Sequence, residues 1–317
     1  SDKDYPKAIA AILRELGDDA AGLRNTFEKL SRGKVTTKDA RWGKLYVQAC
    51  EQRRLHRLAP YLKQIRRVIF TKHRGLGGSH YAYTEALSDG QGECHWLPGT
   101  ALCVLEMDAA GKGTVRTLLD DPAGMIRDPD VSWDGKRVLF ARKKDRSKDD
   151  FHLYEMTVAD GKVRQLTDGL GYADYEGAYL PSGEIVFNSS RCVQTVDCFH
   201  PTVSNLYTCD KDGKFLRRLS FDQVHTNYPA VTPDGRVIYT RWDYSDRGQI
   251  YPQGLFQMYP DGTGQMDLYG NNSYFPTTIM HARGIPGTTK IVAIFSGHHT
   301  RQRGKLGILD PSRGRQE

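Results

Sequence analysis

Histidine, tyrosine, arginine and cysteine side chains recur in a few short segments of this sequence. Neutral imidazole together with thiolate or carboxylate is a ligand set that suits zinc. Histidine or tyrosine beside arginine suits acid–base chemistry on an acidic sugar. The candidate catalytic residues are His80, Tyr83, His225 and Arg241; the candidate metal ligands are His298, His299, Cys198, Cys192 and Glu85; the candidate substrate contacts are Arg74, Arg191, Tyr81 and Tyr244.

Three interpretations of these residues stay open. They could form a metal site, or the active site of a polysaccharide lyase or another glycan enzyme. In the third interpretation they only hold long loops in place, and the protein is a non-catalytic interaction scaffold that binds a protein partner or a small ligand. The sequence contains no nucleophile elbow, phosphate-binding loop or paired-carboxylate spacing that would select one reaction.

The six cysteines leave the redox state of the chain open. No C-x-x-C or C-x-x-C-H motif is present, so neither a zinc ribbon nor a c-type haem attachment site is expected. The separations of Cys192 from Cys198 and of Cys94 from Cys103 each allow a small disulfide loop, which would imply an oxidising compartment. A Cys192–Cys198 disulfide would remove the soft ligand from the zinc site.

Net charge is uneven along the chain. The whole sequence has 45 Lys and Arg against 38 Asp and Glu, whereas residues 1–74 alone have 18 against 8. The remaining chain is close to neutral and has no basic stripe, so nucleic acid is not an expected partner. No apolar run is long enough to span a bilayer. The chain opens on Ser1 without an initiator methionine, which suits a processed or trimmed product.

The elements that must position the candidate residues repeat at intervals of about 50 residues, a period typical of propellers. Apolar runs joined by Asp134-Gly135, Ser182-Gly183 and Asp234-Gly235 predict β-hairpins. A fourth copy, from Phe275 to Ile294, has a longer turn. Each hairpin precedes a further strand, and these further strands begin near Leu102, Leu153, Leu206, Leu255 and Leu306. Four strands per repeat predict the blades of an all-β propeller.

About five blades are countable, and the first and last look incomplete. We therefore predict a propeller over residues 66–317 that missing sequence or a partner completes. In a blade, the start of the first strand, the end of the second strand and the loop to the third share one face. That face is expected to collect the candidate residues, because function concentrates in loops on a rigid scaffold.

Residues 1–65 are expected to form a basic helical arm. One helical stripe contains Tyr5, Ile9, Ile12, Leu13 and Leu16; a second contains Leu23, Phe27 and Leu30; a third contains Trp42, Leu45, Tyr46 and Ala49. Thr37 is the expected cap of the third helix, and Pro60 breaks the pattern.

Four longer segments narrow the comparison with known families. They are Gly78–Glu85, Ser190–His200, Asn271–Gly284 and Ser296–Gly307. With the hairpin repeat, they make residues 66–317 resemble TolB-like propellers, and in particular the propeller domain of hydrazine synthase alpha subunits and their relatives. The resemblance implies an extracytoplasmic, periplasmic or extracellular domain of a larger complex.

The same resemblance implies a zinc ion held partly by a propeller cysteine and a carboxylate. The cysteine would fall on Cys192 or Cys198, and the carboxylate near Glu85 or Asp89. That family's haem-bearing segment has no counterpart here, so nitrogen redox chemistry is not expected from these residues. Reaction, substrate and oligomeric state are left open.

Overall fold

The structure is a computed structural model. It describes residues 4–33, 35–74, 97–196, 202–244, 252–270, 273, 275–297 and 304–315. The chain divides into two compact units, residues 1–68 with 104–116, and residues 69–103 with 117–317. No helix in the described ranges is both long and apolar enough to cross a bilayer.

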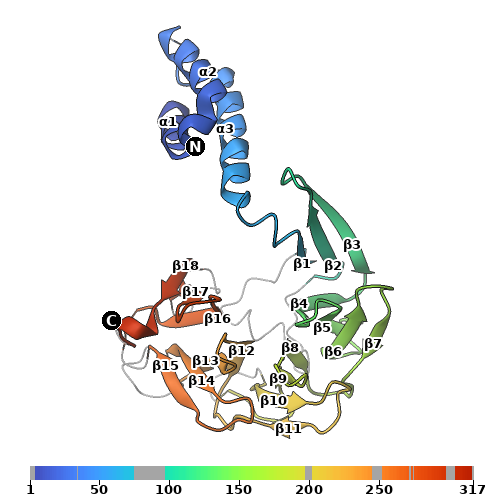
Figure 1. Ribbon diagram of the computed structural model, residues 1–317. Helices are drawn as coiled ribbons and strands as arrows, with labels where there is room; N and C mark the ends of the chain where they lie inside the picture. Colours follow the sequence, from blue (N-terminus) through green and yellow to red (C-terminus); the bar gives the residue numbers. More distant parts are fainter. Residues whose placement is uncertain are drawn as a thin grey trace. The chain divides into compact units, whose positions relative to one another are not determined.

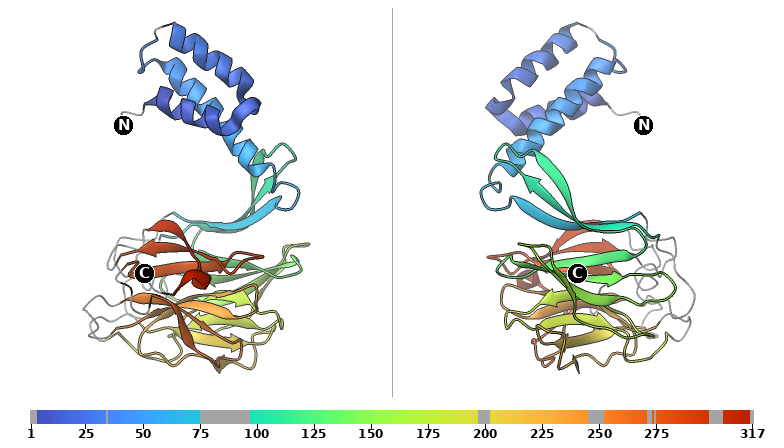
Figure 2. Two further views of the ribbon diagram at one scale, coloured as in Figure 1. Left: turned by 60° about the vertical axis from the view of Figure 1, so that its left-hand side comes forward. Right: turned by 90° about the vertical axis from the view of Figure 1, so that its right-hand side faces the viewer.

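The first unit contains the helical arm. Its helices are α1 (Tyr5–Leu16), α2 (Ala21–Arg32) and α3 (Ala40–Leu58), and a short 3₁₀ turn, η1 (Gly17–Ala20), joins the first two. The three predicted stripes pack into one apolar cluster around Ile9, Trp42 and Leu45, and Figure 2 shows the helices gathered in a bundle. The predicted cap of α3 was two residues early, because Asp39 rather than Thr37 accepts a hydrogen bond from the backbone N–H of Arg41 at 2.9 Å.

Five groups of antiparallel strands follow, which we call blades 1 to 5; blades 4 and 5 belong to one seven-stranded sheet. Their strands are, in order: β1 (Arg67–Lys72), β2 (Thr100–Met107) and β3 (Gly113–Asp121); β4 (Met125–Val131), β5 (Arg137–Lys143), β6 (His152–Thr157) and β7 (Val163–Gln165); β8 (Asp174–Tyr179), β9 (Ile185–Ser189), β10 (Asn205–Cys209) and β11 (Arg217–Arg218); β12 (Thr226–Val231), β13 (Val237–Trp242), β14 (Gln253–Met258) and β15 (Met266–Tyr269); β16 (Thr278–Gly284), β17 (Ile291–Ser296) and β18 (Lys305–Leu309). A 3₁₀ turn, η2 (Pro311–Arg313), follows β18.

Blades 2 to 5 succeed one another around a centre, with β4, β8, β12 and β16 innermost (Figure 1). Blades 4 and 5 are joined by a single parallel bridge between Gln253 and Thr278. Blades 1 and 5 have three strands each within the described residues. The predicted hairpins are confirmed, and their turn glycines have the positive φ that an Asp-Gly or Ser-Gly turn requires, for example 68° at Gly135 and 83° at Gly235.

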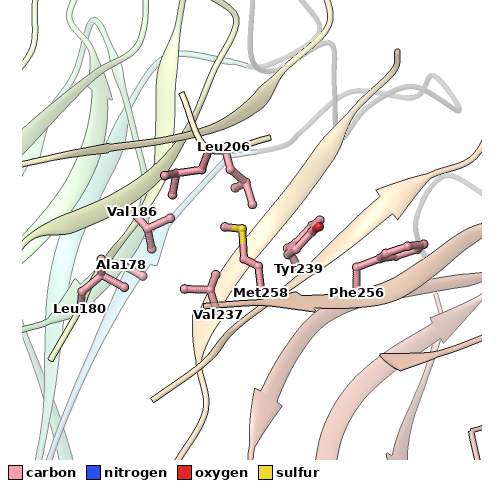
Figure 3. Close-up of a cluster of buried hydrophobic side chains, with 9 residues drawn as sticks. Ala178, Leu180, Val186, Leu206, Val237, Tyr239, Phe256 and Met258 are labelled. Atoms are coloured by element: carbon pink, nitrogen blue, oxygen red, sulfur yellow. The ribbon is translucent and has the colours of Figure 1, made fainter. Parts of the chain in front are cut away.

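Apolar side chains fill the space between adjacent blades. Between blades 3 and 4 (Figure 3), Leu206 and Val186 meet Val237 and Met258, and none of these four side chains has exposed surface. Blades 2, 3 and 4 each bury one face against the blade before them and the other against the blade after them. This is why the strands are predominantly apolar on both faces.

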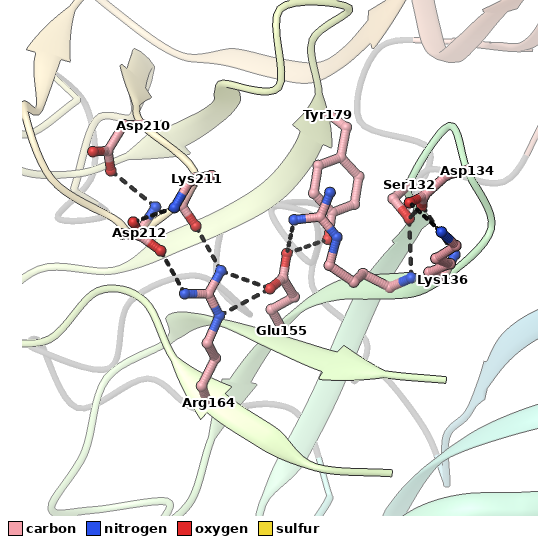
Figure 4. Close-up of polar contacts among 10 residues, drawn as sticks. Ser132, Asp134, Lys136, Glu155, Arg164, Tyr179, Asp210, Lys211 and Asp212 are labelled. Carbon is pink, nitrogen blue, oxygen red and sulfur yellow. Dashed lines mark hydrogen bonds and ion pairs between the residues drawn. The ribbon is translucent and has the colours of Figure 1, made fainter. Parts of the chain in front are cut away.

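A polar contact also links blades 2 and 3 (Figure 4). The buried carboxylate of Glu155 lies 2.7 Å from the guanidinium of Arg164 and accepts a hydrogen bond from the hydroxyl of Tyr179 at 2.8 Å. Arg164 also reaches the carboxylate of Asp212 in the next blade at 2.7 Å. The blades are therefore held in register by charge as well as by apolar packing.

Candidate functional site

The innermost strands of blades 2 to 5 share one irregularity. In each, the pairing register with the second strand shifts at the middle of the strand, which is a β-bulge. The bulge holds a non-glycine residue in the left-handed region: Asp128, Glu176, Tyr228 and His281, with φ between 51° and 58°. We call these four the bulge residues. Because a left-handed backbone is unfavourable for L-residues other than glycine, its recurrence at four equivalent places marks a candidate functional site.

The bulge residues line one cavity of about 260 Å³, which we call the axial cavity. Thr71 and His73 at the end of β1 also line it, as do Asp130 and Arg283. All these residues belong to the second unit. Side chains from four different blades and the end of β1 thus converge on one small space.

A buried arginine supports the acidic side of this cavity. The guanidinium of Arg127 contacts the carboxylate of Asp128 at 2.5 Å and that of Glu176 at 3.3 Å. It also lies over the rings of Phe151 and Tyr175, 5.8 and 5.4 Å from their centroids. Burial opposes the charge of Arg127, but the two carboxylates outweigh this effect and raise its pKa. Arg127 is therefore a fixed cation behind the cavity.

Glu176 is fixed by several donors. Its carboxylate accepts hydrogen bonds from the side-chain amide of Asn188 and from the backbone N–H of Tyr228, the latter at 2.6 Å. Burial and the neighbouring Asp128 carboxylate raise the pKa of Glu176 to about 7, although Arg127 acts in the opposite direction. This carboxyl can therefore take up or release a proton near neutral pH.

The other side of the cavity carries imidazole and phenol rings. The rings of Tyr228 and His281 lie 4.0 Å apart between centroids. The His281 side chain is open to the cavity, yet the surrounding protein partly desolvates it and lowers its pKa to about 4, so the ring is neutral at pH 7. A ring nitrogen of His73 lies 3.0 Å from the carbonyl oxygen of Ile126, and burial lowers the pKa of His73 as well.

Several acceptors in the cavity are unengaged. Oδ2 of Asp128 accepts hydrogen bonds from the guanidinium of Arg127 and from the backbone N–H of Glu176. Oδ2 of Asp130 accepts one from the backbone N–H of Tyr179. Among the described residues, neither Oδ1 has a donor, and the His281 ring makes no hydrogen bond. The cavity thus offers carboxylate and imidazole acceptors to a ligand.

Seven of the residues predicted for the site lie outside the described residues. They are His80, Tyr81, Tyr83, Glu85, Cys198, His298 and His299, and their roles stay predictions. The alternative carboxylate Asp89 lies there too.

Arg191 is engaged within the protein. Its guanidinium contacts both oxygens of the fully buried Asp174, at 3.0 and 2.7 Å, and lies over the ring of Tyr172. His152 lies 3.5 Å from the same carboxylate. Burial of Asp174 is outweighed by these partners, which lower its pKa. A role for Arg191 in substrate binding would require it to exchange this ion pair.

His225 is fully buried and stacks on Trp242, with ring centroids 5.7 Å apart and planes 8° from parallel. Its Nδ1 accepts a hydrogen bond from the backbone N–H of Ser204, and burial lowers its pKa to about 3. Tyr244 contacts Trp242 edge-on at 5.1 Å, and Cys192 packs in the same cluster. The structure therefore brings these three predicted residues together around Trp242, away from the residues that line the axial cavity.

The other predicted side chains are separate. Arg241 lies 3.1 Å from Asp222 and 3.2 Å from Asp243. Arg74 follows His73 and lies against Gly99, where an added Cβ would be 2.9 Å from its Nε.

The structure bears on the pairing of two cysteines that the sequence left open. Cys103 and Cys192 are free thiols, so neither is in the loop disulfide that its spacing allowed; the prospective partners Cys94 and Cys198 lie outside the described residues. The thiol of Cys192 donates to the carbonyl of Val203 at 3.2 Å, and burial raises its pKa. Within the described residues no three His, Cys, Asp or Glu side chains are arranged to hold a metal ion.

The axial cavity was missed from the sequence. Its bulge residues recur at intervals of 48, 52 and 53 residues, and three are followed by Pro or Gly: Pro129, Gly177 and Pro229. That spacing was available as a signal. The side chains themselves are chemically dissimilar, so no single motif marks them.

The strain at the bulges can be measured at His281, whose ring makes no hydrogen bond to a described residue. We expect His281→Gly to be more stable than His281→Ala by about 1 kcal/mol, because only glycine adopts the left-handed backbone without a steric cost. Urea unfolding of both variants gives the difference. At neighbouring Arg283, which is not left-handed, the order should reverse; alanine and glycine ranking alike at both positions would show that the bulge is not strained.

Comparisons with known proteins bear on the fold. No family model matches the sequence, and no curated protein matches it. Among solved structures, hydrazine synthase of Kuenenia stuttgartiensis is similar with a TM-score of 0.62 and 18% identity over 78% of this chain and 37% of that chain. TolB from Acinetobacter baumannii is 16% identical over 78% of this chain and 53% of its own, with a TM-score of 0.49. Oligogalacturonate lyase from Vibrio parahaemolyticus is 12% identical over 77% of this chain and 62% of its own, with a TM-score of 0.47.

This chain therefore spans about a third of the hydrazine synthase chain and about half of TolB. At such identities the likeness concerns the fold alone. The predicted resemblance is confirmed at that level: the chain carries a β-propeller similar in fold to hydrazine synthase, together with N-terminal helices.

Proposed function

We propose that this propeller is the ligand-binding domain of a larger exported enzyme or complex, and that it takes a small polar ligand in the axial cavity. One observation carries the proposal: four strained bulges aim Asp128, Glu176, Tyr228 and His281 at one cavity. Convergent polar groups in a concave site are what a small-ligand site needs. The free Oδ1 atoms and the neutral His281 ring accept donors from the ligand, and Glu176 exchanges a proton with it near pH 7.

The test is a thermal-unfolding screen of the purified chain against a fixed set of compounds. The set contains small carboxylates, primary amines, neutral sugars, oligogalacturonate and zinc chloride. A ligand that binds only the folded state raises the unfolding temperature in proportion to its occupancy. We expect at least one polar compound to raise it in the parent chain and to lose this effect in His281→Ala.

The control is His56→Ala, which removes an exposed histidine from the helical arm. It should leave the stabilisation intact. Equal loss in both variants, or stabilisation that no bulge variant changes, would overturn the assignment of the ligand to the axial cavity.

The zinc and glycan versions of the function are tested by the same screen. Zinc would bind through His298, His299, Cys198 and Glu85, and stabilisation by zinc that His298→Ala abolishes would support that site. Turnover of oligogalacturonate to unsaturated products would support the lyase, whose candidate catalytic residues are His80, Tyr83, His225 and Arg241. Fractionation of the native host would test the periplasmic or extracellular location.

A further inference from the structure

A second cavity, of about 750 Å³, lies where blade 4 meets blade 5; we call it the junction cavity. It is distinct from the axial cavity and shares no lining residue with it. Its size falls within the range of small-molecule sites.

Two departures of blade 5 from the repeat lie beside this space. Its first hairpin turn, residues 285–290, is one residue longer than the corresponding turns of blades 2 to 4. The third strand of blade 5 is followed by the 3₁₀ turn η2. In blades 3 and 4 the third strand is followed by a turn whose glycine, Gly213 or Gly262, lies directly against the preceding blade. The longer hairpin and η2 instead form two walls of the cavity.

The floor of the junction cavity is apolar. Ile238, Leu268 and Ile291 are buried there, and Met266 is 46% exposed. Exposed methionine on an apolar floor adapts readily to the shape of an apolar ligand.

The walls are basic. Arg236, Lys290 and Arg315 line the cavity, against one carboxylate, that of Asp234. Arg236 and Asp234 pair at 3.5 Å. Lys290 and Arg315 make no ion pair with a described residue, and the nearby carboxylate of Asp310 accepts hydrogen bonds from Ser312. Lys290 and Arg315 are therefore exposed cations on the cavity wall, although the carboxylate of Asp310 attracts Lys290.

We propose that the junction cavity binds a small amphipathic carboxylate, whose apolar chain lies on the floor and whose head group meets Lys290 and Arg315. Neither the axial cavity nor the proposed function contributes to this inference.

Calorimetric titration with octanoate at pH 7 tests the proposal, with octylamine as the cation of equal chain length. We expect octanoate to bind one site per chain and octylamine to bind at least about tenfold more weakly, because the walls attract only the anion. Equal binding of the two compounds would overturn the proposal, and so would no binding of octanoate.

Matched variants locate the site. Lys290→Glu should weaken octanoate binding by about tenfold or more, since it replaces an attraction with a repulsion at the head group. Lys305→Glu makes the same charge change on exposed β18, outside the cavity, and should have little effect. Met266→Ser should weaken binding through the floor, while His281→Ala should not. Equal weakening by Lys290→Glu and Lys305→Glu would show a general charge effect and contradict the site.

Discussion

Replacing Arg127 by alanine is expected to lower the free energy of unfolding of the propeller by about 3–5 kcal/mol. The guanidinium is buried, joins the carboxylates of Asp128 and Glu176, and lies over two aromatic rings. Its removal leaves two carboxylates close together with no cation between them. Unfolding in urea, followed by tryptophan fluorescence, measures the loss.

Two further variants make this result specific. Arg217→Ala removes an exposed arginine that donates to the backbone of Asp261, and it should cost less than about 1 kcal/mol. Glu176→Gln keeps an acceptor for Asn188 and Tyr228 and removes a buried charge, so it should cost less than Arg127→Ala. A loss for Arg127→Ala no larger than that for Arg217→Ala would mean that the ion cluster does not support the cavity.

Truncation of Leu206 to alanine is expected to cost about 2–5 kcal/mol. The side chain has no exposed surface and packs between blades 3 and 4 against Val237 and Met258 (Figure 3). The loss combines the missing transfer free energy with the cavity left at a junction that two rigid sheets cannot close. Chemical unfolding gives the value.

Leu216→Ala is the matched control in the same blade. Leu216 is 44% exposed, so the same truncation there should cost less than about 1 kcal/mol. Similar losses at Leu206 and Leu216 would contradict the tight packing of the blades.

Much of the fold was predictable from the sequence because the propeller repeats itself. The leucines at 153, 206, 255 and 306 lie in the third strands of their blades and Leu102 lies in β2 of blade 1, at the spacing the repeat predicted. The turn glycines made the hairpins predictable, because these turns need a positive φ that glycine adopts without a steric cost. The amphipathic stripes of the arm likewise predicted α1, α2 and α3, since a helix buries one face.

The candidate site was less predictable. Reactive residue types drew attention to loops, whereas the axial cavity is built on strands by bulges that no residue type requires: an aspartate, a glutamate, a tyrosine and a histidine occupy them. His225, Arg241 and Arg191 have suitable chemistry by type, yet burial and ion pairs engage them within the protein. Which polar side chains stay open to a ligand depends on tertiary partners such as Asp174 and Trp242, and those partners are not visible as local patterns.

The most direct test of the axial site follows the imidazole of His281 by nuclear magnetic resonance, assigned by its absence in His281→Ala. In the free protein the ring should titrate at about 4, well below the usual value for histidine. On addition of the stabilising compound from the screen, the His281 signal should shift while that of His56 stays in place. A His281 signal that titrates near its usual value and does not respond to the compound would contradict a ligand site at the centre of the propeller.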